Sequence, residues 1–381
     1  MGFLSNRSVT YLNLSNGFAE ILTQIVMVFG SLFLYQHGFS MAGVFFTLGA
    51  ISLGRVLTRL ISFPLVQKIG LQKTVALGLI GWGVAILLLS RVQGLDGWFF
   101  AYVLVYIFFN PMYWVCFHMY YTLMGDAQHR GKQYAMRGVF ILGGQAIFPL
   151  ISAEVIRSFG YPWYFALAIP IVAVALTLLF MCPDKAVPKI SWEWSPQQMR
   201  TTGMKTGLFQ AFNDAITGNL WMFVLYLFFG GKLVSFGGIL TFGVVMQIVF
   251  QLLIGHRFDK GHADRIASIG ATGQILTAFG RVFMPLSVPV ILCLELLAAA
   301  ARLHVKSVVD IATYNDSHNA EHIVWYWVFT EMARDMGAVC GTWTAGLLLY
   351  SGTDPRTTIL LAVPGIMLLW RVLVNVVTRK G

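Results

Sequence analysis

The sequence predicts an all-α polytopic membrane protein, and two observations carry this prediction: its composition and the length of its apolar segments. Of the 381 residues, 57% are hydrophobic and only 11% are charged, whereas about 25% of the residues of a soluble domain are charged. Many apolar runs reach the roughly 20 residues that a helix needs to cross a bilayer. Few show the alternation of a membrane β-barrel strand, so we expect helical spans.

Twelve apolar runs define the expected transmembrane helices, which we number as spans 1 to 12. They cover residues 9–36, 40–67, 74–91, 96–123, 135–157, 161–181, 204–231, 233–257, 265–286, 288–314, 322–350 and 356–378. The first run has no small-residue cleavage site and leads directly into further spans, so we expect it to be retained rather than removed as a signal peptide.

A long polar segment, Cys182 to Lys205, separates six spans from the other six and contains three prolines. It predicts an N-terminal six-helix bundle over residues 1–181, a cytoplasmic linker over 182–203 and a C-terminal six-helix bundle over 204–381.

The basic residues predict the orientation of these spans. The net charge of +10 does not indicate nucleic-acid binding, because the basic residues lie in short loops between spans. With cytoplasmic termini, fourteen Lys and Arg residues fall in inside loops and tails. Four fall outside, namely Arg91, Arg157, Lys232 and Arg356. By the positive-inside rule we expect both termini in the cytoplasm and a location in the inner or plasma membrane.

Two polar turns half a chain apart indicate an internal repeat. The turns Phe63 to Lys73 and Gly255 to Arg265 each link two apolar runs, and their first residues are 192 positions apart. The acids Glu20 and Asp214, each in the middle of an expected helix, are 194 positions apart. The two six-helix halves are therefore expected to be pseudo-symmetric.

The second turn carries a family resemblance. Gly255, Asp259 and Lys260 resemble the Gly-x-Leu-Ala-Asp-Arg-x-Gly-Arg-Lys loop that links spans 2 and 3, and again spans 8 and 9, in the major facilitator superfamily of transporters. The resemblance implies two bundles that rock around a central site. It also implies that spans 3, 6, 9 and 12 face lipid.

The same loop implies a cytoplasmic gate, because in the superfamily it stabilises the outward-open form. A carboxylate such as Asp259 near a helix end can accept hydrogen bonds from a neighbouring helix and pair with an arginine. Gln67 stands at the equivalent place in the first turn and cannot carry a charge, so we expect a weaker latch there. The expected gate residues are Gly255, Arg257, Asp259, Lys260, Lys68 and Gly70.

Ionisable residues inside the spans identify the candidate site, because each costs about 2.5–3.5 kcal/mol at the bilayer centre. Spans 3, 6, 9 and 12 contain only Arg281 and Arg371, whereas the other eight contain thirteen such residues. This distribution fits lipid-facing spans 3, 6, 9 and 12. The candidate substrate- or proton-binding residues are Glu20, Asp214, Arg55, Asn16, Arg302, Glu331, Arg334 and Asp335.

Each candidate also has a purely structural interpretation. Glu20 and Asp214 could bind a proton or a cationic group, or could only hydrogen-bond to neighbouring helices. The charges of spans 10 and 11 could handle substrate or could form an ion-pair network that ties the two spans together. Arg59 is expected to lie near the cytoplasmic end, where its side chain could simply extend to the membrane surface.

The function expected is secondary active transport of a small polar or amphipathic organic solute by alternating access, coupled to protons through Glu20 or Asp214. We expect a monomer that needs no cofactor or metal ion, since His118, His129 and His322 are expected near loops in solvated or capping roles. The alternatives are a lipid or drug exporter of the same fold, a non-transporting sensor, and an enzyme. The chain is not expected to be an enzyme, which would need convergent catalytic groups near one membrane surface.

Overall fold

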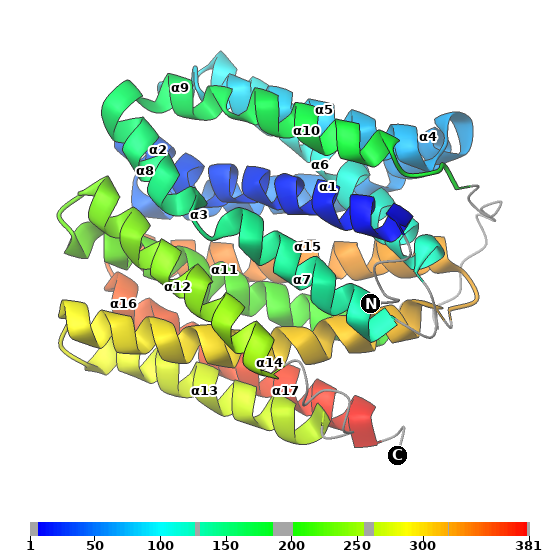
Figure 1. Ribbon diagram of the computed structural model, residues 1–381. Helices are drawn as coiled ribbons and strands as arrows, with labels where there is room; N and C mark the ends of the chain where they lie inside the picture. Colours follow the sequence, from blue (N-terminus) through cyan, green and yellow to red (C-terminus); the bar gives the residue numbers. More distant parts are fainter. Residues whose placement is uncertain (1–6, 126–129, 186–200, 255–262, 319, 379–381) are drawn as a thin grey trace.

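The computed structural model describes residues 7–125, 130–185, 201–254, 263–318 and 320–378. Every regular element in these ranges is a helix, and Figure 1 shows how the helices are arranged. The all-α class is therefore confirmed.

The first half of the chain contains helices in each of its six expected spans. Span 1 is built from α1, the π-helix η2 and α2, and span 2 from α3, η3 and α4. The bounds are α1 (Arg7–Gln24), η2 (Ile25–Gly30), α2 (Ser31–Gln36), α3 (Met41–Thr58), η3 (Arg59–Ile61), α4 (Ser62–Ile69), α5 (Leu71–Leu89), α6 (Gly97–Met124), α7 (Arg130–Gln145), α8 (Phe148–Phe159), α9 (Tyr161–Ala166) and α10 (Ala168–Phe180).

The second half likewise has helices in each expected span. Their bounds are α11 (Thr202–Phe228), α12 (Leu233–Ile254), α13 (Ala263–Phe283), α14 (Val288–His318), α15 (Ile323–Tyr350), α16 (Pro355–Thr358), η6 (Ile359–Leu361) and α17 (Ala362–Thr378). Within the described ranges, nine helical segments are long and apolar enough to cross a membrane. The segments α11, α13 and α15 are not among the nine, so the number of twelve spans stays a prediction.

The helices of the two halves lie on opposite sides of the molecule. In Figure 1 most helices of the first half, blue to green, lie in the upper part, and most helices of the second half, green to red, lie in the middle and lower parts. Helix α1 begins and α17 ends at the same end of the molecule. Helices α5 and α10 lie along one edge and α13 and α17 along the other. These four outer helices expose large apolar side chains, for example Ile80, Ile169, Leu276 and Leu368.

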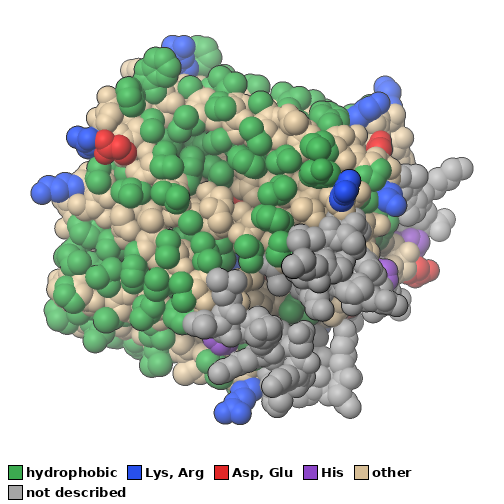
Figure 2. Space-filling view, viewed as in Figure 1, with side chains coloured by type: hydrophobic (Ala, Val, Ile, Leu, Met, Phe, Trp, Pro, Cys, Tyr) green, Lys and Arg blue, Asp and Glu red, His purple; other side chains and the backbone are tan. Residues whose placement is uncertain are grey.

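The surface has the pattern of a protein surrounded by lipid. Figure 2 shows hydrophobic side chains across the middle of one face, with most of the visible charged side chains near the two ends. This separation is expected because charged groups are costly within the hydrocarbon layer.

The two largest sets of contacts between the halves involve α3 with α15 and α12 with α7 and α8. Both sets use glycines where backbones or rings approach closely. A Cβ on Gly49 would lie 2.1 Å from the Trp343 ring, and one on Gly237 would lie 2.6 Å from the Pro149 carbonyl oxygen.

Candidate functional site

A cavity of about 430 Å³ lies between the two halves, within the size range typical of small-molecule sites. We call it the central cavity. Its lining comes from α1, α3, η3, α6 and α7 of the first half and from α11, α12, α14 and α15 of the second. Each half therefore contributes four of its expected spans to the wall.

The structure brings most of the candidate residues to this cavity. Seven of the eight line it, namely Glu20, Arg55, Asp214, Arg302, Glu331, Arg334 and Asp335. The eighth, Asn16, is buried behind the wall. Its side chain accepts a hydrogen bond from Arg137 Nε at 2.8 Å and donates one to Tyr113 Oη at 3.0 Å. Asn16 thus orients Arg137, which does line the cavity.

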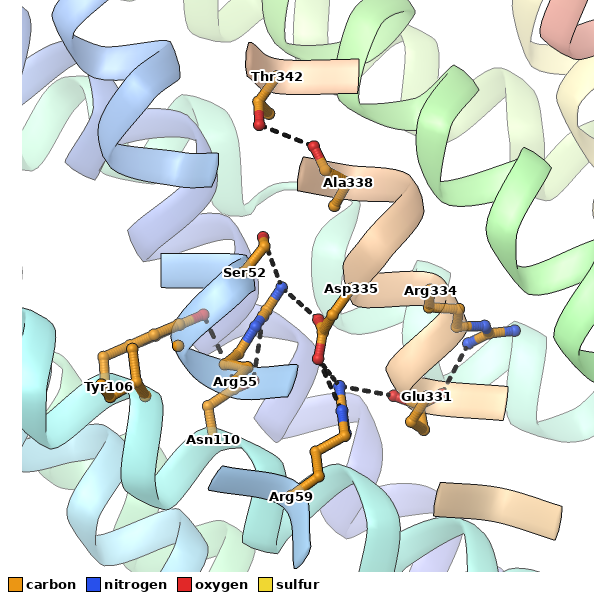
Figure 3. A network of polar contacts seen from close by, with 12 residues as sticks. Ser52, Arg55, Arg59, Tyr106, Asn110, Glu331, Arg334, Asp335, Ala338 and Thr342 are labelled. Atoms are coloured by element: carbon orange, nitrogen blue, oxygen red, sulfur yellow. Dashed lines mark hydrogen bonds and ion pairs between the residues drawn. The ribbon is translucent and has the colours of Figure 1, made fainter. Parts of the chain in front are cut away.

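Asp335 is the centre of an ion-pair cluster that crosses from one half to the other (Figure 3). Its Oδ2 accepts a hydrogen bond from Arg59 Nε at 2.6 Å, and its Oδ1 lies 2.8 Å from Arg55 Nη2. Arg59 Nη2 also lies 3.2 Å from Glu331 Oε2. Arg59 is only 1% exposed, so the expectation that it extends to the membrane surface is wrong; two acids from α15 hold it inside.

The cluster continues from α15 to α14. Glu331 Oε1 lies 3.4 Å from Arg334 Nη1, and Arg334 Nη2 lies 3.8 Å from Asp310 Oδ1. With Arg55 and Arg59, the three arginines balance three acids. Among the described residues, one ion pair, Arg334 with Asp310, joins spans 10 and 11, and Arg302 and Lys306 take no part in it. The shortest ion pairs of the cluster run from span 11 to span 2, in the other half.

An aromatic cluster lies beside these ion pairs. Tyr314 Oη accepts a hydrogen bond from Arg137 Nη1 at 2.9 Å and lies 2.7 Å from His118 Nδ1. The His118 ring stacks on Trp327, with ring centres 4.5 Å apart. His118 is therefore buried among rings from the other half, and the prediction of a solvated or capping role is wrong for this histidine.

Four further charged residues line the central cavity but, unlike the cluster around Asp335, have no close ion-pair partner among the described residues. Within the described part of the chain, no ion pair within 4 Å is found for Glu20, Asp214, Arg302 or Lys306. Asp214 and Lys306 lie near the middle of their helices, yet both are exposed, because they face the cavity. These groups are available to a solute.

A second buried ion pair lies away from the central cavity, and no pattern in the sequence indicated it. Arg281 of α13 places Nη2 3.0 Å from Glu295 Oε1, and Trp221 Nε1 donates to the same oxygen at 2.5 Å. Arg281 is 2% exposed. The resemblance implied that α13 faces lipid, but this arginine points inward from it, and the 14-residue separation of the pair spans the turn between α13 and α14.

The gate residues are described only in part. Gly255, Arg257, Asp259 and Lys260 lie outside the described residues. Lys68 is exposed near the end of α4. Gly70 has φ +89°, and a Cβ there would lie 2.9 Å from Asp184 Oδ2; Oδ1 of the same carboxylate accepts a hydrogen bond from Gln72 N at 3.3 Å. Asp184, at the start of the expected linker, thus supplies a carboxylate at the start of α5.

Comparison with known families decides what kind of protein this is. The sequence model described as "Major Facilitator Superfamily" matches residues 12–304, which is more than half of the chain. This chain belongs to the major facilitator superfamily. The match agrees with the paired polar turns, and it makes the chain a membrane transporter.

Solved structures support the same fold. The human organic anion transporter MFSD10 (TETRAN) superimposes with a TM-score of 0.71 at 13% identity, covering 96% of this chain and 99% of that one. The nucleoside transporter NupG gives 0.68 at 12%, covering 97% and 99%. A bacterial homologue of the iron transporter ferroportin, in its outward-facing state, gives 0.72 at 12%, covering 100% of both chains. A search of curated protein sequences found no significant match.

Proposed function

We propose that this superfamily member moves a small polar or amphipathic organic solute by alternating access, with the solute bound in the central cavity. The observation that carries this proposal is the cavity itself, which both halves line with charged side chains that have no close ion-pair partner among the described residues. In such transporters two bundles rock around a fixed central site. Residues 1–181 and 204–381 are the proposed bundles, 182–203 the cytoplasmic linker, and a monomer with cytoplasmic termini the working unit.

Proton coupling is assigned to Glu20 or Asp214. Both line the cavity, one from each half, and both are accessible from it. Asp214 interacts electrostatically with Arg302 and Lys306 of α14 and with Arg334 of α15. When Asp214 is charged, its carboxylate competes with an anionic group of the solute for these bases. When Asp214 is protonated, the bases are free to bind the anionic group. Proton uptake and solute binding are thereby linked.

Proteoliposomes containing the purified protein test the proposal. Internal pH and solute uptake are followed while a panel of small organic solutes is offered, with Glu20→Gln and Asp214→Asn beside the parent protein. We expect solute-dependent proton movement that one of these variants abolishes. Glu321→Gln is the control, because that side chain is 87% exposed.

The results separate the parts of the proposal. Solute uptake without proton movement, unchanged in both variants, would exclude the coupling role of the two acids and leave the transport itself. A panel without any transported solute would count against the central cavity as a transport site.

A further inference from the structure

A second cavity opens beside the central one. It has a volume of about 210 Å³ and shares the lining residues Gln247 and Arg302 with the central cavity. We call it the annex. Much of its wall is apolar, with side chains from both halves: Val28, Phe29, Trp221, Met222, Leu240 and Val244.

Two features of the annex wall favour ligand binding there. Val28 and Phe29 belong to the π-helix η2, and π-helical segments occur frequently at functional sites. On α11, Gly218 lines the annex, and a Cβ added there would meet no atom within 4 Å. An apolar group of a ligand can therefore lie between span 1 and α11.

The charges around the annex favour an anion at its mouth. Among the described residues, Glu295 is the one acid that lines it, and Arg281 and Trp221 already bind its Oε1. Arg302, in contrast, has no ion pair within 4 Å in the described part of the chain and lines both cavities. Lys306, one turn further along α14, is exposed to the central cavity.

The remaining charges of the central cavity show the same bias. Once the balanced cluster around Asp335 is set aside, the described lining has two acids and three bases: Glu20 and Asp214 against Arg137, Arg302 and Lys306. One base is in surplus. A solute with one negative charge neutralises it, whereas a cationic solute would add to the surplus.

We propose that the substrate is an amphipathic organic anion whose acidic group binds Arg302 and Lys306 while its apolar chain or ring occupies the annex. This inference rests on the proposed function, since it takes the central cavity as the substrate site. It adds the chemical class of the substrate and a division of the site into a charged part and an apolar part.

Ligand binding to the full-length protein in lipid nanodiscs tests the division. The probes are phenylacetate, 3-phenylpropanoate, 4-phenylbutanoate and 5-phenylpentanoate, each with its neutral amide and its amine counterpart, titrated calorimetrically against loaded and empty nanodiscs. We expect each added methylene to tighten carboxylate binding by up to about fourfold. Each amide and amine should bind at least about tenfold more weakly than the carboxylate of the same chain length, because it loses the charge-assisted hydrogen bonds.

Two substitutions separate the parts of the site. Arg302→Gln should weaken every carboxylate by about tenfold or more and preserve the dependence on chain length. Gly218→Leu should fill part of the annex and so remove that dependence. Gly238→Leu is the matched control, because a Cβ there also meets no atom within 4 Å but lines neither cavity.

The inference would be overturned by amines that bind as tightly as the carboxylates, or by a chain-length dependence that survives in Gly218→Leu. Transport of another solute in proteoliposomes, with no carboxylate binding, would also overturn it while sustaining the proposed function. Carboxylate binding with the expected profile, but without transport of any probe, would support the bipartite site and contradict the proposed function.

Discussion

The two sets of contacts between the halves differ in chemistry. Where the end of α3 and η3 meet α15, ion pairs form the contact: Arg55 and Arg59 face Glu331 and Asp335. All four side chains are at most 11% exposed. Charges this deeply buried have lost most of their hydration, and their partners replace it.

Where α12 meets α7 and α8, no ion pair joins the side chains that the structure describes. A Cβ on Gly138 of α7 would lie 2.6 Å from Gln251 Nε2, and one on Gly237 of α12 would lie 2.6 Å from the Pro149 carbonyl oxygen of α8. Close backbone packing holds these helices, as is common between membrane helices rich in small residues.

The comparison indicates how each contact can come apart. Separation of α3 from α15 exposes charged groups and is favourable only where water or a solute takes over their interactions. Separation of α12 from α7 and α8 breaks no ion pair among the described residues. The first contact should therefore be sensitive to loss of a charge, and the second to added volume.

Asp335→Asn should have the largest effect. The substitution would keep the shape of the side chain but remove the charge that both Arg55 and Arg59 contact. Loss of one partner of a buried ion pair costs about 3–5 kcal/mol. The free energy of unfolding, measured by reversible SDS titration in mixed micelles, should fall by this amount.

The exposed pair of Glu154 and Arg157 provides the control for Asp335→Asn. Both side chains are about half exposed or more, at 48% and 63%, and exposed ion pairs contribute little. Glu154→Gln should leave the unfolding curve nearly unchanged. Equal effects of the two substitutions would mean that burial does not distinguish the contacts.

Gly237→Ala should have an intermediate effect on the other contact. The new methyl group would lie 2.6 Å from the Pro149 oxygen and 2.8 Å from Ala153 Cβ, so α8 and α12 must move apart. Overpacking of this kind costs about 1–3 kcal/mol, measured by the same SDS titration.

The adjacent Gly238→Ala provides the opposite case. It meets no atom within 4 Å, and alanine is favoured over glycine in a helix by about 1 kcal/mol. It should therefore leave stability unchanged or raise it. A similar loss of unfolding free energy in Gly237→Ala and Gly238→Ala would refute close packing as the basis of this contact.

The fold was largely predictable from the sequence, because it depends on apolar length and on the paired polar turns. Composition identified the class, and helices occupy each expected span. Local interruptions were not predicted. Span 5 divides into α7 and α8 after Gln145, with Pro149 in the first turn of α8, where its missing N–H is tolerated. The π-helix η2 (Ile25–Gly30) contains no proline, and no pattern in its sequence predicted it.

The candidate site was predictable as a set of residues but not as a set of contacts. The cost of intramembrane charge identified seven residues that line the central cavity. Helical spacing shows which side chains share a face, but not which helix covers that face. Arg59 and Asp335, 276 residues apart, could not be paired from spacing. The resemblance implied a lipid-facing span 9 but did not indicate which way Arg281 points. Arg137 and Lys306, two of the thirteen charged residues of the other eight spans, also line the cavity, although neither was among the eight candidates.

Tyr226→Phe should have the smallest effect, at a third contact between the halves away from the termini. Gln36 Nε2 donates to Tyr226 Oη at 2.6 Å, and the ring of Phe223 packs on Tyr35 beside it. The substitution removes one neutral hydrogen bond and retains the ring contact, so SDS titration should show a loss of about 1 kcal/mol. Tyr350→Phe, at a side chain 80% exposed, should cause none. A loss as large as that of Asp335→Asn would place the dominant connection between the halves at this neutral contact, and the charged one could then no longer be what holds the halves together.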